Sequence, residues 1–187
     1  MGLVQRVNPV GIDKIICELQ SDLFIELTNN FGWTGYESFD RAYRYKKKED
    51  TLAEVYLQNG EYKEVLFNDN QTVTSFFLAD ERRNFKASES KFEQDVCVIF
   101  QANLKKLFPA LTNRGDEEMI DNIYKAIKNK HWDGRLAEII TGVDRVYESL
   151  KISYNKKYFD DMSYFSIARF NFKLLYTNTK CSTQAIK

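Results

Sequence analysis

Two long segments in which apolar and polar side chains alternate constrain the fold of this chain most strongly. The first, residues 92–104, places six apolar side chains on one side: Phe92, Val96, Val98, Phe100, Ala102 and Leu104. The second, residues 165–176, alternates a similar set with polar residues: Ala168, Phe170, Phe172, Leu174 and Tyr176. A period of two is typical of a strand that packs one face against a core. We therefore predict two strands, the first of about ten residues or more and longer than the usual five or six.

Shorter segments predict the rest of a sheet. Strand-like residues occur at 37–45, 54–58, 61–67 and 72–79. Asn59 and Gly60 separate the second and third of these segments, and both residue types tolerate the positive φ that a two-residue hairpin turn requires. Residues 46–50 form a charged turn after the first segment. Hairpins of this kind join antiparallel strands, so we predict an antiparallel sheet.

Helical spacing of apolar residues indicates two main amphipathic helices. Residues 10–28 carry one stripe: Ile12, Ile15, Ile16, Leu19, Leu23 and Leu27. A second helix follows Pro109, with Asn113 or Asp116 as its cap and a stripe of Ile120, Ile123, Tyr124 and Ile127. A short strand at 138–141 and a short helix at 143–150 are expected before the final strand.

These elements predict an α+β fold, with an antiparallel β-sheet, two main amphipathic helices packed on one face, and extended loops. The chain has 187 residues, which corresponds to one domain at roughly 100–200 residues per domain. Within this single domain, residues 1–187, three segments lack a strong pattern. They are a polar arm or loop at 80–91, a long loop at 153–164 and a C-terminal tail at 177–187.

The sequence contains none of the catalytic or cofactor-binding motifs that we sought. GxSxG, GxxxxGK[ST] and GxGxxG are all absent. The single histidine, His131, excludes a multi-histidine metal site within one chain. Cys17, Cys97 and Cys181 are far apart in the sequence, so neither a disulfide framework nor a zinc site is expected. We therefore predict no catalytic residue, no metal and no cofactor.

One enzymatic alternative stays open. Glu61 and Lys63 lie two apart on a predicted strand and therefore share a face. Together with Asp50 upstream, they resemble the acidic and Glu-x-Lys pattern of restriction-type nucleases. Two carboxylates can hold Mg²⁺ while a lysine polarises the attacking water. The alternative function is thus a magnesium-dependent nuclease-like domain.

Charge and hydropathy exclude several classes of protein. Lys plus Arg and Asp plus Glu both number 27, so the chain lacks the basic excess of a protein that coats nucleic acid. We expect non-specific contact with DNA at most. No apolar run approaches the roughly 20 residues of a membrane span, and the start shows no signal-peptide pattern. Candidate contacts with partners or a DNA channel are Lys46, Lys47, Lys48, Arg82, Arg83, Lys86, Lys156 and Lys157.

The order of elements resembles a known family. A leading helix, a hairpin-rich sheet, a long strand that enters a second helix and the closing strand FSIARFNFKLLY are similar to the tail-terminator and related head–tail connector ring subunits of tailed phages. The resemblance implies that residues 92–104 and 165–176 are neighbours in the sheet. It also implies a non-enzymatic structural protein of the virion, assembled in the host cytoplasm.

Exposed sheet edges and polar arms fit such a role, because identical subunits in head-to-tail contact close into rings when their rotation permits. The expected partners are copies of the chain itself, together with neighbouring portal, connector and tail proteins. A cytosolic, non-enzymatic adaptor domain that forms no ring is the second alternative.

Overall fold

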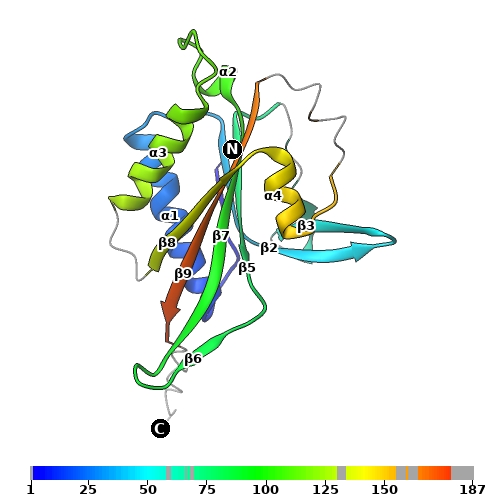
Figure 1. The fold of residues 1–187 in the computed structure, drawn as a ribbon, viewed down its shortest axis with the longest axis vertical. Coiled ribbons are helices and arrows are strands. Elements are labelled where there is room, and N and C mark those ends of the chain that lie inside the picture. Colours follow the sequence, from blue (N-terminus) through cyan, green and yellow to red (C-terminus); the bar gives the residue numbers. More distant parts are fainter. Residues whose placement is uncertain are drawn as a thin grey trace.

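Strands β7 (Lys91–Asn103) and β9 (Phe165–Tyr176) form the centre of the sheet in the computed structural model (Figure 1). They pair antiparallel over their whole length, from Phe92 opposite Tyr176 to Asn103 opposite Phe165. Both strand predictions are confirmed, and the two strands are neighbours as the resemblance implied. The structure describes residues 2–57, 60–65, 67, 70–129, 134–154, 159 and 164–177.

The described residues form one nine-stranded sheet in the order β4-β3-β2-β5-β7-β9-β8, with β1 added beside β2 and β6 beside β7. The remaining strands are β1 (Leu3–Val4), β2 (Tyr36–Lys47), β3 (Asp50–Tyr56), β4 (Tyr62–Glu64), β5 (Val73–Ala79), β6 (Asn84–Lys86) and β8 (Gly134–Thr141). The helices are α1 (Ile12–Asn29), α2 (Leu104–Leu107), α3 (Asp116–Lys128) and α4 (Val143–Leu150). The α+β class is therefore confirmed.

The sheet is mixed, so the prediction of an antiparallel sheet was wrong in part. β2 and β5 run parallel, with Tyr36 opposite Val73, and β1 is also parallel to β2. The predicted hairpins are present, since β2 pairs antiparallel with β3 and β3 with β4. Hairpin signals specify pairing only between strands adjacent in sequence. After β4 the chain returns to the other side of β2, and the direction of β5 depends on that connection.

Helices cover both faces of the sheet. On the first face, α1 and α3 pack over β7 and β9, and this core contains Leu23, Ile123 and Phe100. On the second face, α4 packs over the same strands, with Val146 and Ile99 in a separate cluster (Figure 1). The two main helices thus share one face as predicted. A third helix covers part of the other face, where Cys97 and Ile99 interrupt the polar side of the β7 alternation.

Helix α3 begins differently from the prediction. Its N-cap is Gly115, with φ at 79° and no side-chain cap hydrogen bond, so neither Asn113 nor Asp116 caps it. A Cβ at position 115 would lie 3.0 Å from the Phe108 ring and 3.1 Å from Leu111. The positive φ and this close approach together favour glycine.

The polar segment 80–91 is largely a β-hairpin. β6 pairs with the start of β7, with Asn84 opposite Glu93 and Lys86 opposite Lys91. This hairpin projects from one end of the sheet (Figure 1), and residues 80–90 are all exposed. We call residues 80–91 the arm.

Of the predicted loop 153–164, the structure describes only four residues: Ser153, Tyr154, Phe159 and Tyr164. Phe159 is buried, with its ring centroid 4.8 Å from that of Phe165. The tail after Thr177 lies outside the described residues. Within the part of the chain that is described, no helix has the length and apolar character needed to span a membrane.

Candidate functional site

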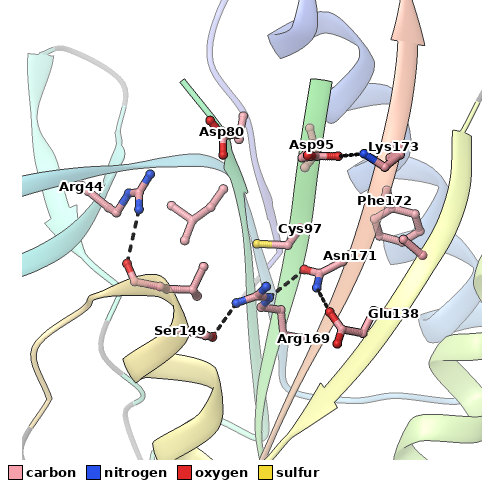
Figure 2. A pocket seen from close by; sticks show the side chains of 15 residues that line it. Arg44, Asp80, Asp95, Cys97, Glu138, Ser149, Arg169, Asn171, Phe172 and Lys173 are labelled. Atoms are coloured by element: carbon pink, nitrogen blue, oxygen red, sulfur yellow. Dashed lines mark hydrogen bonds and ion pairs between the residues drawn. The ribbon is translucent and has the colours of Figure 1, made fainter. Parts of the chain in front are cut away.

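A polar groove opens on the second face of the sheet, where α4 ends and leaves the strands uncovered (Figure 2). The cavity has a volume of about 370 Å³ and is lined by residues of β2, β5, β7, β8, β9 and α4. Its charged side chains are Arg44, Asp80, Asp95, Glu138, Arg169 and Lys173. We call this cavity the groove.

Strand β9 supplies the floor of the groove because its side chains alternate between the two faces. Phe170, Phe172 and Leu174 are buried in the core of the first face. The intervening Arg169, Asn171 and Lys173 therefore line the second face. The same alternation that builds the core thus places three polar side chains in a row in the groove.

A chain of hydrogen bonds holds Arg169 in place. Its Nε donates to Oδ1 of Asn171 at 2.7 Å, and its Nη1 donates to Oγ of Ser149 on α4 at 2.7 Å. Asn171 in turn donates from Nδ2 to Oε2 of Glu138 at 2.9 Å (Figure 2). Fixed in this way, the guanidinium is oriented before any ligand arrives, which lowers the entropy cost of binding.

Arg44 approaches the same turn of α4 from β2. Its Nη1 donates to the backbone carbonyl of Leu150 at 3.3 Å. Among the described residues, neither Arg44 nor Arg169 forms an ion pair with a carboxylate, whereas Lys173 pairs with Asp95 at 3.0 Å. The α4 end of the groove therefore carries two guanidinium groups whose charge this part of the chain does not neutralise by direct pairing.

Cys97 lines the groove from β7 but is not a reactive thiol. Burial raises its pKa to about 11, although the positive charges of Arg169 and Arg44 act in the opposite direction. A thiol that keeps its proton at neutral pH is a poor nucleophile.

Both described cysteines should resist alkylation in the folded chain. Burial raises the pKa of Cys17 to about 12, and Cys97 is raised to about 11, each from an ordinary value of 9.0. We expect labelling by iodoacetamide at pH 8 to be at least about tenfold slower at both residues than in urea, because little thiolate forms and access is closed. Mass spectrometry of labelled peptides measures this. Equal rates in buffer and urea would contradict it.

The same shifts predict the response of stability to alkaline pH. Above pH 9 the unfolded chain loses thiol protons that the folded chain retains. The contribution of these groups is therefore complete below pH 9 and is lost as the pH rises towards about 12. We expect the free energy of unfolding to be lower at pH 10.5 than at pH 8. Urea titrations at the two values, repeated with the Cys97→Ala variant, check the sign.

The nuclease residues do not come together. The backbone N of Leu57 donates to the carbonyl of Glu61 at 2.7 Å, which places Glu61 beyond the end of the β3–β4 pairing. Asp50, at the far end of β3, lies seven residues before Leu57 and thus about 23 Å away along the strand at about 3.3 Å per residue. Lys63 forms an ion pair with Glu37 at 3.4 Å. Within the described ranges, no group of three His, Cys, Asp or Glu side chains could hold a metal ion.

The predicted basic contacts fall into two separate groups. Lys46, Lys47 and Lys48 lie at the exposed end of the β2–β3 hairpin, and Arg82, Arg83 and Lys86 lie on the arm. The two hairpins project from different sides of the molecule (Figure 1), so they form no continuous basic surface. Acidic neighbours pair with two of these lysines, Lys47 with Glu64 at 3.9 Å and Lys86 with Glu93 at 3.6 Å. Lys156, Lys157, His131 and Cys181 lie outside the described residues.

The groove was not predicted from the sequence. A signal was present in the regular Arg169, Asn171, Lys173 alternation of the closing strand. That pattern indicates a polar face on the closing strand. It does not indicate that Arg44 of β2 and Ser149 of α4 lie beside this face. Comparison with known proteins adds nothing to this point, because no protein family and no curated protein matches the chain.

Proposed function

We propose that this chain is a structural, non-enzymatic subunit that assembles with copies of itself into a ring at the head-to-tail junction of a tailed phage. The observation that carries the proposal is the arm. Eleven consecutive residues, 80–90, are exposed, and exposed segments held on a rigid scaffold are where binding residues are commonly found. An arm that packs so little against its own subunit suits contact with another molecule.

An aromatic residue on the β6 strand of the arm supports the same proposal. Phe85 is 60% exposed, and its ring lies 5.2 Å from that of Phe92. Phe92 in turn stacks on Tyr176 at 5.7 Å. Aromatic side chains are enriched at protein interfaces. The row of three rings therefore ends in an apolar surface that a neighbouring subunit can cover.

The two edge strands of the sheet have features that discourage pairing with a strand of another subunit. β8 pairs only with β9 among the described strands, but its register shifts between Leu136 and Glu138. A bulge and the flanking charges of Arg135 and Glu138 are features that protect an edge strand. β4, at the opposite edge, has only three residues. We therefore place the main contact between subunits at the arm.

The equality of basic and acidic residues suits a subunit that surrounds passing DNA, because a basic channel would retain the phosphate backbone. Neighbouring portal, connector and tail proteins are the further partners, and the virion is the proposed location. The closing strand beside the long strand, at the centre of the sheet, agrees with the resemblance on which this placement rests.

The mass of the purified chain in solution tests the proposal. We expect light scattering to give a multiple of the 22.0 kDa subunit mass, and negative-stain images to show closed rings. A chain that stays monomeric at micromolar concentration, and that binds neither portal nor tail proteins, would support the adaptor alternative instead. Cleavage of DNA that requires Mg²⁺ and is lost in Glu61→Ala would support the nuclease alternative.

A further inference from the structure

We propose that the groove receives the tip of the arm from a second copy of this chain, with Arg44 and Arg169 binding the carboxylate of Glu89. The inference rests on the proposed self-assembly and names the contact that would produce it. It joins two features that form no ion pair among the described residues: the guanidinium groups of Arg44 and Arg169 at one end of the groove, and the exposed carboxylate of Glu89 on the arm.

The pocket is suited to one carboxylate. A guanidinium has five N–H donors, and Arg169 uses Nε and Nη1 for neutral partners on Asn171 and Ser149. Arg44 uses Nη1 for the carbonyl of Leu150. Both side chains are thus anchored to the same turn of α4 while retaining donors. Two anchored guanidinium groups at the α4 end of the groove can each donate charge-assisted hydrogen bonds to a carboxylate.

The rest of the groove disfavours a polyanion such as DNA. Glu138 is exposed on one side and Asp80 on the other, and neither forms an ion pair among the described residues. These carboxylates repel a ligand with several adjacent phosphates. They favour instead a segment in which one acidic residue is flanked by basic ones.

The arm has this pattern of charge. Glu89 lies in its terminal turn, and the basic residues Lys86 and Lys91 lie two to three positions away on either side. Glu89 is exposed and forms no ion pair within the described part of the chain, whereas Glu93 near the base of the arm pairs with Lys86. A Glu89 carboxylate at the two arginines would bring Lys86 and Lys91 towards the acidic rim.

The contact must form between copies. The arm projects away from the sheet and from α4 (Figure 1), whereas the groove lies beside the last turn of α4 (Figure 2). Its tip therefore cannot enter the groove of its own subunit. An arm that fills the groove of the next copy makes a heterologous, head-to-tail contact, and such contacts generate rings when the rotation closes.

Charge reversal with rescue tests this inference. Glu89→Arg and Arg169→Glu should each weaken self-association by about tenfold or more, because each places like charges in contact. An equimolar mixture of the two variants should recover association, since every arm then meets a groove of opposite charge in an alternating assembly. Sedimentation velocity measures the association of each variant and of the mixture.

Glu81→Arg is the matched control, because it makes the same charge change on the arm but away from its tip. It should associate like the wild type. Arg44→Glu provides a second groove variant in case Arg169→Glu fails to fold, and circular dichroism checks each variant. The mixture of Glu89→Arg with Arg44→Glu should recover association in the same way.

The outcomes separate this inference from the proposed function. Rings that persist in Glu89→Arg, or single variants that dissociate without recovery on mixing, would overturn the arm-in-groove contact and leave ring assembly standing. A wild-type chain that is monomeric would overturn both. Loss of association in Glu81→Arg as well would show a general charge effect and would also overturn the contact.

Discussion

Replacing Asp40 with alanine is expected to lower the free energy of unfolding by about 3–5 kcal/mol, the usual cost of breaking a buried ion pair. The Asp40 side chain is 1% exposed, and its Oδ2 lies 2.7 Å from Nε of Arg6. The same oxygen accepts a hydrogen bond from the backbone N of Arg6 at 2.8 Å. Without this carboxylate, Arg6 loses its buried ionic partner on β2.

The remaining charges nearby do not replace Asp40. Asp13 accepts from Nη1 of Arg6 at 2.8 Å and from Nη1 of Arg41 at 3.2 Å, so it already serves two guanidinium groups. After Asp40→Ala, two arginines share one carboxylate in a region that is mostly closed to water. This excess of buried positive charge is the reason for the large effect.

Urea unfolding at pH 7 measures the loss, and Asp121→Ala is its control. Asp121 forms an exposed ion pair with Lys125, one turn away on α3. Removal of such a surface pair changes stability by about 0.5 kcal/mol or less. A change below about 1 kcal/mol for Asp40→Ala would show that the N-terminal ion pairs contribute no more than surface pairs.

Truncation of Phe100 to alanine is expected to cost about 3–5 kcal/mol through the cavity that it leaves. Phe100 is a fully buried residue of β7. Its ring lies 6.1 Å from that of Trp33, 6.3 Å from Tyr36 and 6.0 Å from Phe170. These partners come from two separate segments of the chain, residues 33–36 and β9, and both are held in the sheet or beside it, so they cannot all move into the space.

Phe85→Ala is the matched control, with the same change at a ring that is 60% exposed. It should alter the free energy of unfolding by less than about 1 kcal/mol. If the arm contacts a neighbouring subunit, the same variant should weaken self-association. Equal losses of stability in Phe100→Ala and Phe85→Ala would contradict the assignment of the core to the first face of the sheet.

The face of each long strand could be predicted because it depends on local spacing. Val96, Val98 and Phe100 share the core of the first face, as the period of two indicates. The same holds for Ile16, Leu23 and the other apolar residues of α1. The strands β2, β5, β7 and β9 and the helices α1, α3 and α4 occur where the sequence predicts them, whereas β3 begins at Asp50, four residues before the predicted strand and within the predicted turn.

The nuclease hypothesis shows where local spacing stops being informative. Glu61 and Lys63 were predicted to share a strand face, but Glu61 lies just before β4, and the third member of the set, Asp50, lies at the other end of β3. Sequence distance does not tell which residue of one strand lies opposite another. Only the register, which follows from the turn and from packing, settles that question.

The sequence alone determined the main helices and long strands and which side of each meets the core, because both depend on periodicity over neighbouring residues. Tertiary structure alone decided that β5 runs parallel to β2, that α4 covers the second face, and that Arg44, Ser149 and Arg169 meet beside the groove. These residues come from β2, α4 and β9. Their meeting depends on the path of the whole chain, which no local pattern encodes.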